Sequence, residues 1–420
     1  MEKIIVRGGR KLQGEVDISI AKNSVLPIIV ATILNPTEII LKKVPMLEDV
    51  TVLINLLREL NCEVQFSSIT GDLKINTLNL KEVDPNSELI RKMRASFLVM
   101  GPMLARFGRC KISMPGGCNI GSRPVDLHLK GFKSLGIESE IGYGYVEAKV
   151  DKLHGNRIYL DFPSVGATEN IMMAAILAPG ITVIENAAEE PEIWDLARFL
   201  NSMGAKIEGA GYWKITIHGV SQLKQPEPFT PIFDRIEAGT FMVAAGITNS
   251  KITINGVNEE HLMPTIEKLK ECGVYCSIDG QKMIVDGTQE KKPVDIKTMP
   301  YPGFPTDMQA QIMALLSITR GVSVITETVF ENRFMHVGEL GRMGANIKID
   351  GRIAIVEGVS TLTGCEVKAT DLRAGAAMIL AGLVANGETE IGEVYHIDRG
   401  YTNIEEKFKK LGAEIYRIHK

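Results

Sequence analysis

The residues best suited to chemistry lie on one glycine-rich loop, MPGGCNIGSRPVDLHLKG, which follows the strand-like segment KISM. Cys118 is at its centre, and Arg123 stands where a helix is expected to begin. A nearby guanidinium group and a helix N-terminus both favour the thiolate form of a cysteine. Such a thiol can act as a nucleophile or as a proton donor. The alternative is a turn that carries a bystander cysteine, and the loop by itself favours neither.

Charged residues also recur where otherwise apolar helices begin, as at Lys22, Arg94 and Arg373. A cation at this end opposes the helix dipole, so a bound anion explains these three better than a capping role does. Thr306, directly before Asp307, is instead expected to be an N-cap, because a hydroxyl can accept a bond from a first-turn amide.

These residues sit within an internal repeat. The phrase that ends each copy is a helix closing on Gly, or once on Asn, followed by a strand: RELNCEV, KSLGIES, NSMGAKI, KECGVYC, GRMGANI and KKLGAEI. Five near-equal steps of 75, 68, 69, 71 and 68 residues separate the six copies. A left-handed C-cap accounts for the glycines, and Asn61 is the usual second choice at such a position.

Each copy reads as a helix apolar on nearly every face, a strand, an amphipathic helix and hairpin strands. A helix that is apolar all round must be buried on every side. We therefore expect an α/β fold in which sheets surround a helical interior. The alternative is an ordinary alternating α/β protein built on a parallel sheet.

The last copy reaches Lys420 before its second hairpin strand. The segment KIIVRGGRKLQGEVDISIAKN resembles IAIVEGVSTLTGCEVKATDLR of the fifth copy, so residues 1–19 are expected to complete the last unit. The expected domains are 20–229, carrying the Cys118 loop, and a discontinuous 1–19 plus 230–420. Two chain crossings make a natural hinge, so the active site is expected in the cleft between them.

Composition excludes several function classes. A net charge of −4 argues against broad nucleic-acid binding, and no apolar segment reaches the roughly 20 residues that cross a bilayer. The N-terminus lacks the apolar block of a signal peptide. The six cysteines and seven histidines form no metal-binding spacing, so no metal is expected. Free thiols fit a reducing compartment, here the cytoplasm.

Several long segments resemble one family, the UDP-N-acetylglucosamine 1-carboxyvinyltransferases, which are enolpyruvyl transferases. These segments are AKNSVLP, MRASFLVMGP, PGGCNIGSRPVDLHL, SVGATENI, DRIEAGTF, PGFPTDMQAQ, ENRFMHV, TDLRAGAAMILAGL and YHIDRGYTNIEEK. The resemblance implies two inside-out α/β barrels, each of three helix-strand-helix-strand-strand units. It implies enolpyruvyl transfer from phosphoenolpyruvate to the 3-hydroxyl of UDP-N-acetylglucosamine, the first committed step of peptidoglycan precursor synthesis. It also implies no cofactor, no obligatory protein partner and sensitivity to the epoxide fosfomycin.

The resemblance further assigns roles to individual residues. It implies that Cys118 is the general acid and can form a covalent adduct with the donor. Asp307 contacts the reacting hydroxyl, as the base or as an orienting group. Phosphoenolpyruvate contacts fall on Lys22, Asn23, Arg94, Arg123 and Arg399. Nucleotide-sugar contacts fall on Asn23, Arg94, Arg123, Pro124, Val125, Asp126, Leu127, Ser164, Val165, Gly166, Asp307, Val329, Arg333, Asp371 and Arg373.

Two rival functions follow from the same resemblance. The shikimate-pathway enolpyruvyl transferase shares the fold and the donor, but it acts on shikimate 3-phosphate and lacks the cysteine loop. A non-catalytic relative that only binds the nucleotide sugar is the second rival. The retained Cys118 loop and donor-binding cations favour the nucleotide-sugar enzyme over both.

Overall fold

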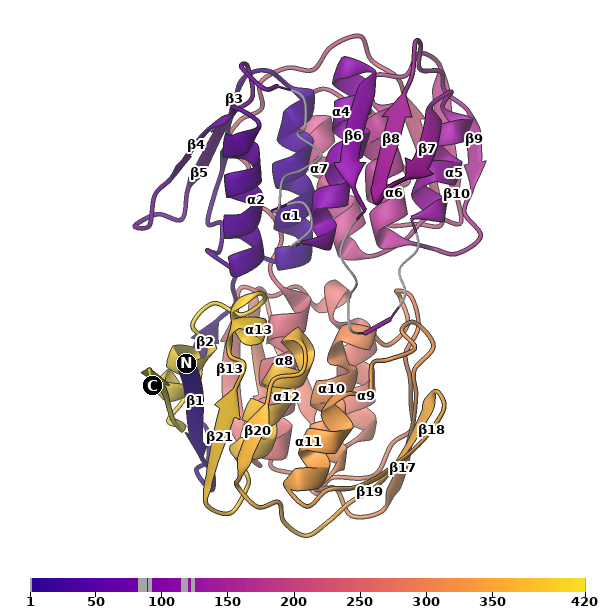
Figure 1. Cartoon of the computed structure of the whole chain (residues 1–420). Coiled ribbons are helices and arrows are strands. Elements are labelled where there is room, and N and C mark those ends of the chain that lie inside the picture. Colours follow the sequence, from indigo (N-terminus) through magenta and orange to yellow (C-terminus); the bar gives the residue numbers. More distant parts are fainter. Residues whose placement is uncertain (1, 82–88, 90–92, 115–119, 122–124, 420) are drawn as a thin grey trace. The chain divides into compact units, whose positions relative to one another are not determined.

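The helices that are apolar on nearly every face are buried, as the sequence predicts. Every residue of α8 (Arg235–Ile247) and α10 (Gln309–Leu316) is buried, and so is all of α12 (Leu372–Gly382) except Leu372. The computed structural model of the chain describes residues 2–81, 89, 93–114, 120–121 and 125–419 (Figure 1). None of the helices within these residues is long and apolar enough to cross a membrane.

The chain divides into two compact units. The first contains residues 2–19 and 233–419 together with Ile120 and Gly121. The second contains the described residues of 20–114 and 125–232. The sequence places the second chain crossing at 229/230, and the structure places it at Ile232/Phe233.

Three repeats build the second unit. Its buried helices are α1 (Lys22–Ala31), α4 (Met100–Phe107) and α6 (Val165–Ala175), and its amphipathic helices are α2 (Glu48–Glu59), α5 (Asp126–Ser134) and α7 (Pro191–Ser202). Short 3-10 helices are η1 (Thr32–Leu34) and η2 (Arg94–Val99). The strands are β3 (Glu38–Leu41), β4 (Glu63–Phe66), β5 (Leu73–Asn76), β6 (Arg109–Ser113), β7 (Glu138–Gly142), β8 (Tyr145–Lys149), β9 (Arg157–Tyr159), β10 (Ile181–Glu185), β11 (Lys206–Glu208) and β12 (Lys214–His218).

The first unit repeats this plan around α8, α10 and α12. Its outer helices are α9 (Met263–Glu271), α11 (His336–Arg342), α13 (Tyr395–Asp398) and α14 (Ile404–Lys410), with 3-10 helices η3 (Glu259–His261) and η4 (Thr306–Met308). The strands are β1 (Glu2–Arg7), β2 (Glu15–Asp17), β13 (Lys251–Asn255), β14 (Tyr275–Asp279), β15 (Lys282–Asp286), β16 (Ile296–Lys297), β17 (Val322–Thr326), β18 (Asn346–Asp350), β19 (Ile353–Glu357), β20 (Glu366–Lys368), β21 (Glu388–Gly392) and β22 (Glu414–His419).

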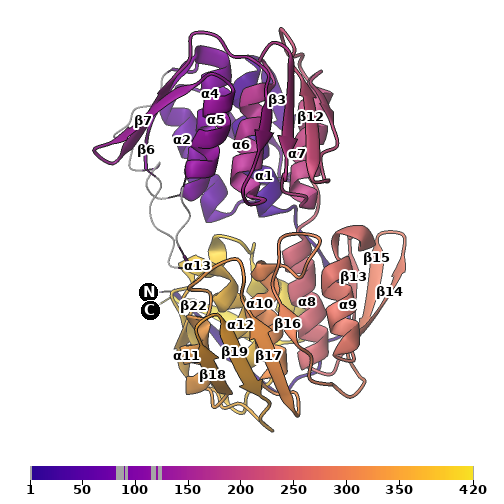
Figure 2. The same ribbon diagram turned by 90° about the vertical axis from the view of Figure 1, so that its right-hand side faces the viewer.

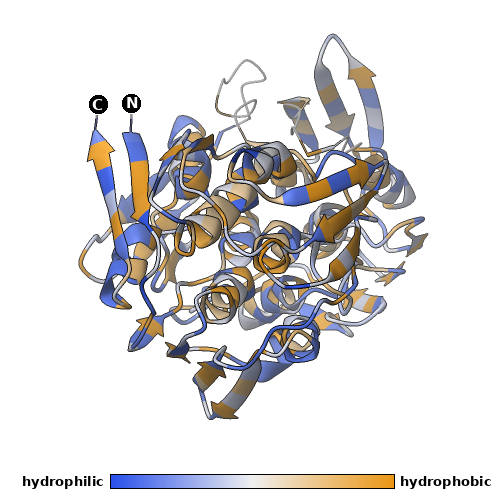
Figure 3. Cartoon of the chain, turned by 90° about the horizontal axis from the view of Figure 1, so that it is seen from below, coloured by the Kyte–Doolittle hydropathy of each residue, from blue (hydrophilic) through white to orange (hydrophobic). Residues whose placement is uncertain are grey.

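The six sheets formed by the described residues share one order of their three main strands. The strand after the buried helix pairs antiparallel with the second strand of the following hairpin, as in β10–β12 and β17–β19. In four sheets a short strand, β2, β9, β16 or β20, adds a parallel edge. This mixed pairing excludes the ordinary parallel sheet. The sheets cover the buried helices (Figure 2), and the outer strands alternate between hydrophilic and hydrophobic residues (Figure 3).

The start of the chain completes two sheets of the first unit. Strand β1 lies between β21 and β22, with Ile4 opposite both Ile391 and Arg417, so it supplies the hairpin strand that the last copy lacks. Strand β2 instead pairs with β13 of the fourth copy. The expectation that residues 1–19 complete the last unit is therefore confirmed for β1 and wrong for β2, because this short strand forms the parallel edge of the β13 sheet.

The predicted helix caps are confirmed. Each glycine of the repeated phrase has a positive φ, between 89° at Gly136 and 94° at Gly344, and Asn61 has a φ of 67°. A side chain with a Cβ is strained in this left-handed region, and Gly and Asn tolerate it best. The caps let each amphipathic helix stop abruptly and turn into its hairpin.

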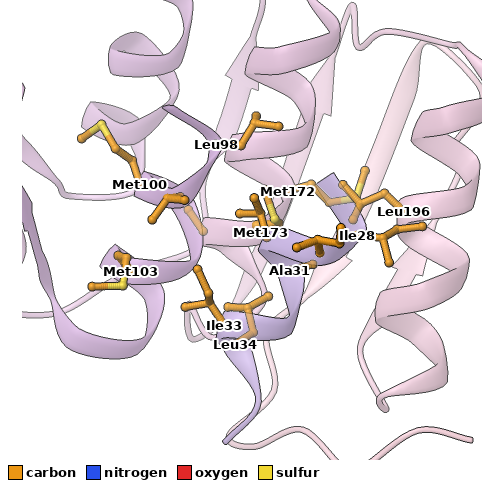
Figure 4. Close-up of a cluster of buried hydrophobic side chains, with 14 of the residues drawn as sticks. Ile28, Ala31, Ile33, Leu34, Leu98, Met100, Met103, Met172, Met173 and Leu196 are labelled. Atoms are coloured by element: carbon orange, nitrogen blue, oxygen red, sulfur yellow. The ribbon is translucent and has the colours of Figure 1, made fainter. Parts of the chain in front are cut away.

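Methionines and branched aliphatic side chains fill the interior of the second unit. Figure 4 shows Ile28 and Ala31 of α1 beside Met172 and Met173 of α6, and all four are fully buried. The unbranched methionine side chain adapts to irregular gaps between helices that cross closely. The buried helices thus form a packed core and leave their N-terminal turns to carry polar groups.

The chain passes between the units after Ser19 and after Ile232, and backbone bonds within each unit hold these segments. In the first unit the Asp234 amide donates to the Ser19 carbonyl over 2.8 Å, and in the second the Ala21 amide donates to the Ile232 carbonyl over 2.8 Å. Buried carboxylates reinforce both: Glu237 accepts from the Ser19 amide, and Asp195 accepts from the Ile232 amide. In each unit, these bonds therefore join the two chain segments that lead to the other unit.

Candidate active site

In the first unit, the carboxylate of Asp307 is held by two guanidinium groups. Arg333 Nη2 donates to Oδ1 over 2.9 Å, and Arg373 donates to Oδ2 from Nε over 3.2 Å and from Nη2 over 2.9 Å. The Arg333 and Arg373 side chains are only 3% and 2% exposed, whereas that of Asp307 is 25% exposed. Two buried cations therefore orient one carboxylate that remains accessible.

Three separate elements bring these residues together. Asp307 lies in η4 directly before α10, Arg333 lies in the loop after β17, and Arg373 lies in the first turn of α12. Asp371 caps α12, accepting from the amides of Arg373 over 2.8 Å and Ala374 over 3.1 Å. The cap satisfies two amides that a helix start leaves unpaired and so fixes the backbone that carries Arg373.

A buried polar cluster lies beneath this pair. The Arg373 guanidinium lies 5.4 Å from the centroid of the Tyr401 ring, whose hydroxyl hydrogen-bonds Thr240 over 3.0 Å. Gln311 Nε2 donates to the Asp307 carbonyl over 2.9 Å and to the Tyr401 hydroxyl over 3.3 Å. Burial raises the pKa of Tyr401, so its hydroxyl stays protonated at neutral pH. The cluster joins α8, α10 and α12 at the depth of Asp307.

In the second unit, Lys22 pairs with Asp49. The Nζ–Oδ2 distance is 2.6 Å, and the two side chains are 11% and 6% exposed. Lys22 is the first residue of α1, and Asp49 lies in the first turn of α2. The anion that the sequence predicts beside this cation is thus, in part, a carboxylate of the protein. The same holds for Arg373 and Asp307.

The start of α6 forms a second cluster in that unit. Ser164 caps α6 by accepting from the Ala167 amide over 3.3 Å, and Val165 and Gly166 begin the helix. A Cβ on Gly166 would lie 3.4 Å from Cε1 of His128, in van der Waals contact, so the start of α6 lies directly beside that ring. His128 Nδ1 in turn lies 3.1 Å from Asn170 Nδ2. The predicted Ser164–Gly166 segment therefore lies beside α5, the helix that Val125 caps.

The remaining predicted residues differ in exposure. Asn23 and Asp126 are exposed, Val125 is buried, and Leu127, Val165, Val329, Asp371 and Arg399 are half-buried. Cys118, Arg123 and Pro124 lie outside the described residues, as does the side chain of Arg94, although its backbone begins η2. Just after Cys118, the Ile120 carbonyl accepts from the Asn332 amide over 2.9 Å, next to Arg333 in the first unit.

The expected cap at Thr306 is wrong. The residue before η4 is Pro305, and no side chain caps this helix. Thr306 instead donates its hydroxyl to the buried carboxylate of Glu327 over 2.9 Å. Asp49, Tyr401 and Gln311 were not predicted from the sequence, because their partners are distant in the chain. The signal that could have indicated them is a charged or amide side chain within an otherwise apolar or repeated segment.

A groove of about 540 Å³ on the first unit is a separate feature. It is lined by residues of α9, β16, β17 and the turn at 299–304, among them Pro264, Ile296 and Phe304. Its lining contains neither Asp307 nor the two arginines, so the site is defined by the charged residues at the helix starts.

Known proteins resemble this chain along its whole length. The family model of EPSP synthase (3-phosphoshikimate 1-carboxyvinyltransferase) matches residues 6–408. UDP-N-acetylglucosamine 1-carboxyvinyltransferase 2 of Clostridium tetani is 65% identical over 418 residues, with 100% of both chains covered. UDP-N-acetylglucosamine 1-carboxyvinyltransferase 1 of Clostridium acetobutylicum is 63% identical, also with 100% of both covered. The near-equal identities do not assign the chain to either numbered form.

Solved structures share the fold. The enolpyruvyl transferase NikO from Streptomyces tendae matches with a TM-score of 0.88 at 23% identity, covering 99% of this chain and 98% of NikO. EPSP synthase from Acinetobacter baumannii matches with a TM-score of 0.76 at 19% identity over 100% of both chains. The two units are therefore the inside-out α/β barrels of enolpyruvyl transferases. The chain belongs to the enolpyruvyl transferase family, in the branch of the UDP-N-acetylglucosamine 1-carboxyvinyltransferases.

Proposed function

We propose that this protein transfers the enolpyruvyl group of phosphoenolpyruvate to the 3-hydroxyl of UDP-N-acetylglucosamine and releases phosphate. It thereby begins peptidoglycan precursor synthesis. The observation that carries the proposal is Asp307, an accessible carboxylate oriented by two buried guanidinium groups at a helix start. Relatives that are 56–65% identical over the full chain and bear this activity in their names support it.

The addition step needs one proton delivered and one removed, and the elimination step removes another. The methylene carbon of the donor gains a proton while the sugar oxygen bonds to the neighbouring carbon and loses its own proton. Phosphate then leaves, and loss of a methyl proton restores the carbon–carbon double bond. In our proposal Cys118 supplies the first proton, and Asp307 accepts the hydroxyl proton or orients that hydroxyl.

The donor is trianionic when fully ionised and needs cations around it. We assign this role to Lys22, Arg123 and Arg399, with Asn23 and Arg94 in support. Lys22 is suited to it because Asp49 fixes its ammonium group at the start of α1. Since these residues come from both units, the proposal implies one site shared by the two. Domains 20–229 and 1–19 plus 230–420 would then close around the substrates.

The nucleotide sugar would contact the remaining predicted residues. Ser164, Val165 and Gly166 offer the N-terminus of α6, where amides and the helix dipole favour an anionic group. Pro124 and Val125 precede α5 in the sequence, Asp126 and Leu127 begin it, and α5 packs against α6. Arg333 and Arg373 contact Asp307 in the first unit, and with Val329 and Asp371 they would hold the sugar against it.

The proposal includes its setting. The enzyme would work in the cytoplasm on two small molecules, without a cofactor, a metal, nucleic acid, a membrane or an obligatory protein partner. Five cysteines in the described part of the chain are free thiols, which supports a reducing compartment.

Turnover of the purified protein tests the proposal. Phosphate release from phosphoenolpyruvate is measured with UDP-N-acetylglucosamine and, separately, with shikimate 3-phosphate, and the product is identified by mass. We expect release and an enolpyruvyl adduct with the nucleotide sugar alone. Turnover with shikimate 3-phosphate would identify the other enzyme. Tight binding of the nucleotide sugar without turnover would identify a non-catalytic relative.

A further inference from the structure

Glu327 is a buried carboxylate that the proposed reaction does not use. It follows β17 directly and is 1% exposed. Oε1 accepts from the Thr298 hydroxyl over 2.8 Å and from the amides of Val329 over 2.8 Å and Phe330 over 3.1 Å. Oε2 accepts from the Thr306 hydroxyl over 2.9 Å. Among the described residues no lysine or arginine pairs with it, so these four bonds compensate its burial.

The four bonds connect the two segments that build the Asp307 site. Thr306 directly precedes Asp307 in η4, whereas Val329 and Phe330 begin the loop that carries Arg333. One carboxylate therefore links the backbones on both sides of the Asp307–Arg333 contact. Because Glu327 bonds to both segments, it fixes the distance between η4 and the loop. This distance in turn sets the 2.9 Å contact between Asp307 and Arg333.

Comparison of the repeats shows that this position is unusual. In four other copies the equivalent residue at the end of the first strand adopts a left-handed conformation: Lys43, Asn186, Gly256 and Glu393, with φ between 54° and 81° for the last three and 55° for Lys43. Glu327 is not among the described residues with a positive φ. In the fifth copy a carboxylate bonded to the amides two and three residues further on thus takes the place of the left-handed turn.

The surrounding threonines make the connection rigid. The Thr328 amide donates to the Thr298 hydroxyl over 2.9 Å, and the Thr328 hydroxyl donates to the Thr298 carbonyl over 2.6 Å. The Glu327 amide also donates to the Arg352 carbonyl over 2.9 Å. Because its backbone is bonded to Arg352, the Glu327 carboxylate has a fixed position. Its bonds to Thr306, Val329 and Phe330 therefore hold η4 and the Val329–Arg333 loop in place.

We propose that Glu327 is a positioning residue for enolpyruvyl transfer, which sets η4 and the Val329–Arg333 loop at the separation that aligns Asp307 with the reacting hydroxyl. The inference rests on the proposed function. Glu327 contacts neither substrate in this proposal. It positions the backbone, whereas Asp307 contacts the reacting hydroxyl.

Four variants test it in the full-length protein: Glu327→Ala, Glu327→Gln, Thr306→Val and Thr298→Val. Kinetics with both substrates are measured beside thermal unfolding. We expect Glu327→Ala to lower kcat by about 10- to 100-fold, since a displacement of about 1 Å costs that much, with little change in the KM for phosphoenolpyruvate. Glu327→Gln should recover most of the kcat, because the amide can still accept from Val329 and Phe330 and can donate to Thr306.

The threonine pair is the matched control. Each substitution removes one hydroxyl that donates to the Glu327 carboxylate, but only Thr306 is adjacent to Asp307 in the chain. We expect Thr306→Val to lower kcat several-fold more than Thr298→Val at equal or smaller loss of thermal stability. This arm also stands if Glu327→Ala does not fold.

Two results would overturn the inference. One is an unchanged kcat in folded Glu327→Ala with only a lower unfolding temperature. The other is an equal fall in kcat for both threonine variants, which would indicate general loosening. Absence of turnover in the unsubstituted protein would instead refute the proposed function, so the two failures are distinguishable.

Discussion

Asp307 and Arg373 form a two-point contact in which Nε and Nη2 of the guanidinium both donate to Oδ2 of the carboxylate. Arg333 occupies the other oxygen. Charge-assisted bonds of this kind favour the ionised carboxylate and restrict its rotation. This geometry therefore suits Asp307 to orient the sugar hydroxyl as well as to accept its proton.

Substitution of Asp307 by asparagine separates charge from shape. The amide keeps the size of the side chain but leaves two buried guanidinium groups without their anion. We expect kcat to fall by about 10²- to 10⁴-fold if the carboxylate takes the proton. The free energy of unfolding should fall by about 3–5 kcal/mol, the usual cost of unpairing a buried charge.

Steady-state kinetics and urea unfolding measure both effects. Asp234→Asn is the stability control, because Asp234 caps α8 through the amides of Ile236 and Glu237 and has no bond to Asp307 among those described. A near-normal kcat in Asp307→Asn would exclude the base and leave orientation as the role.

The Lys22–Asp49 pair predicts a selective loss of donor binding. Lys22→Ala removes a cation assigned to phosphoenolpyruvate, so its KM should rise by about tenfold or more, equivalent to about 1.4 kcal/mol. Asp49→Asn leaves the cation but not its buried partner, and the rise should be smaller. The KM for UDP-N-acetylglucosamine should change little in either variant. Equal increases for both substrates would contradict the assignment.

The cysteines should differ sharply in reactivity. Burial raises the pKa of Cys62, Cys110 and Cys276 to about 12 and that of Cys272 to about 11, so these thiols stay protonated at neutral pH. The thiolate is the reactive form. Fosfomycin should therefore label Cys118 first, as peptide mapping by mass spectrometry can measure. Predominant labelling of Cys110 or Cys272 would contradict the role given to Cys118.

The same residue permits a functional test. Cys118→Asp should keep measurable turnover and resist the epoxide, because a carboxylic acid can also donate a proton. Cys118→Ser serves as the control, since a hydroxyl is a far weaker acid. Equal inactivity of both variants would argue for an obligatory covalent step.

Burial is the main cause that lowers the pKa of His336 to about 4; the charge of Asp371 opposes this shift, and the charge of Arg333 favours it. The unfolded chain, with a pKa near 6.5, therefore binds a proton that the folded protein refuses between pH 6.5 and 4. Stability from this residue is present above pH 6.5 and is lost as the pH falls to about 4. The difference amounts to about 3 kcal/mol.

Unfolding by urea across this range, in parallel with His336→Met, isolates the contribution. The variant places a neutral side chain beside Met313, whose sulfur lies 3.2 Å from Nε2 of the histidine. Its free energy of unfolding should fall less steeply below pH 6.5. Parallel curves for the two proteins would show that His336 is not the titrating group.

The repeated scaffold could be predicted because its signals are local. A glycine at a helix end requires a left-handed backbone wherever it occurs, so Gly136 and its equivalents marked each copy before any contact was known. Helices apolar on every face indicated the interior in the same way. The assignment of β2 failed because a three-residue edge strand carries little pattern of its own.

The site could be predicted only in part. Lys22 and Arg373 stood out because a cation at a helix start is unfavourable without a nearby anion, but spacing does not name that anion. Asp307 is 66 residues from Arg373 and 26 from Arg333; the packing of α10 against α12 brings Asp307 to Arg373, and the loop after β17 brings Arg333 to it. Thr306 was assigned to a cap for the same reason, since its acceptor Glu327 is 21 residues away.

The pairing of β1 with β22 has a consequence for chain connectivity. Glu2 lies opposite His419, so the two ends of the chain are neighbours in one sheet. A circular permutant in which these ends are joined by a short linker and the chain is opened between Ile232 and Phe233 would make the first unit continuous apart from Ile120 and Gly121. The link from Ser19 to Ile20 would then connect the first unit, as the N-terminal part of the permutant, to the second unit as its C-terminal part.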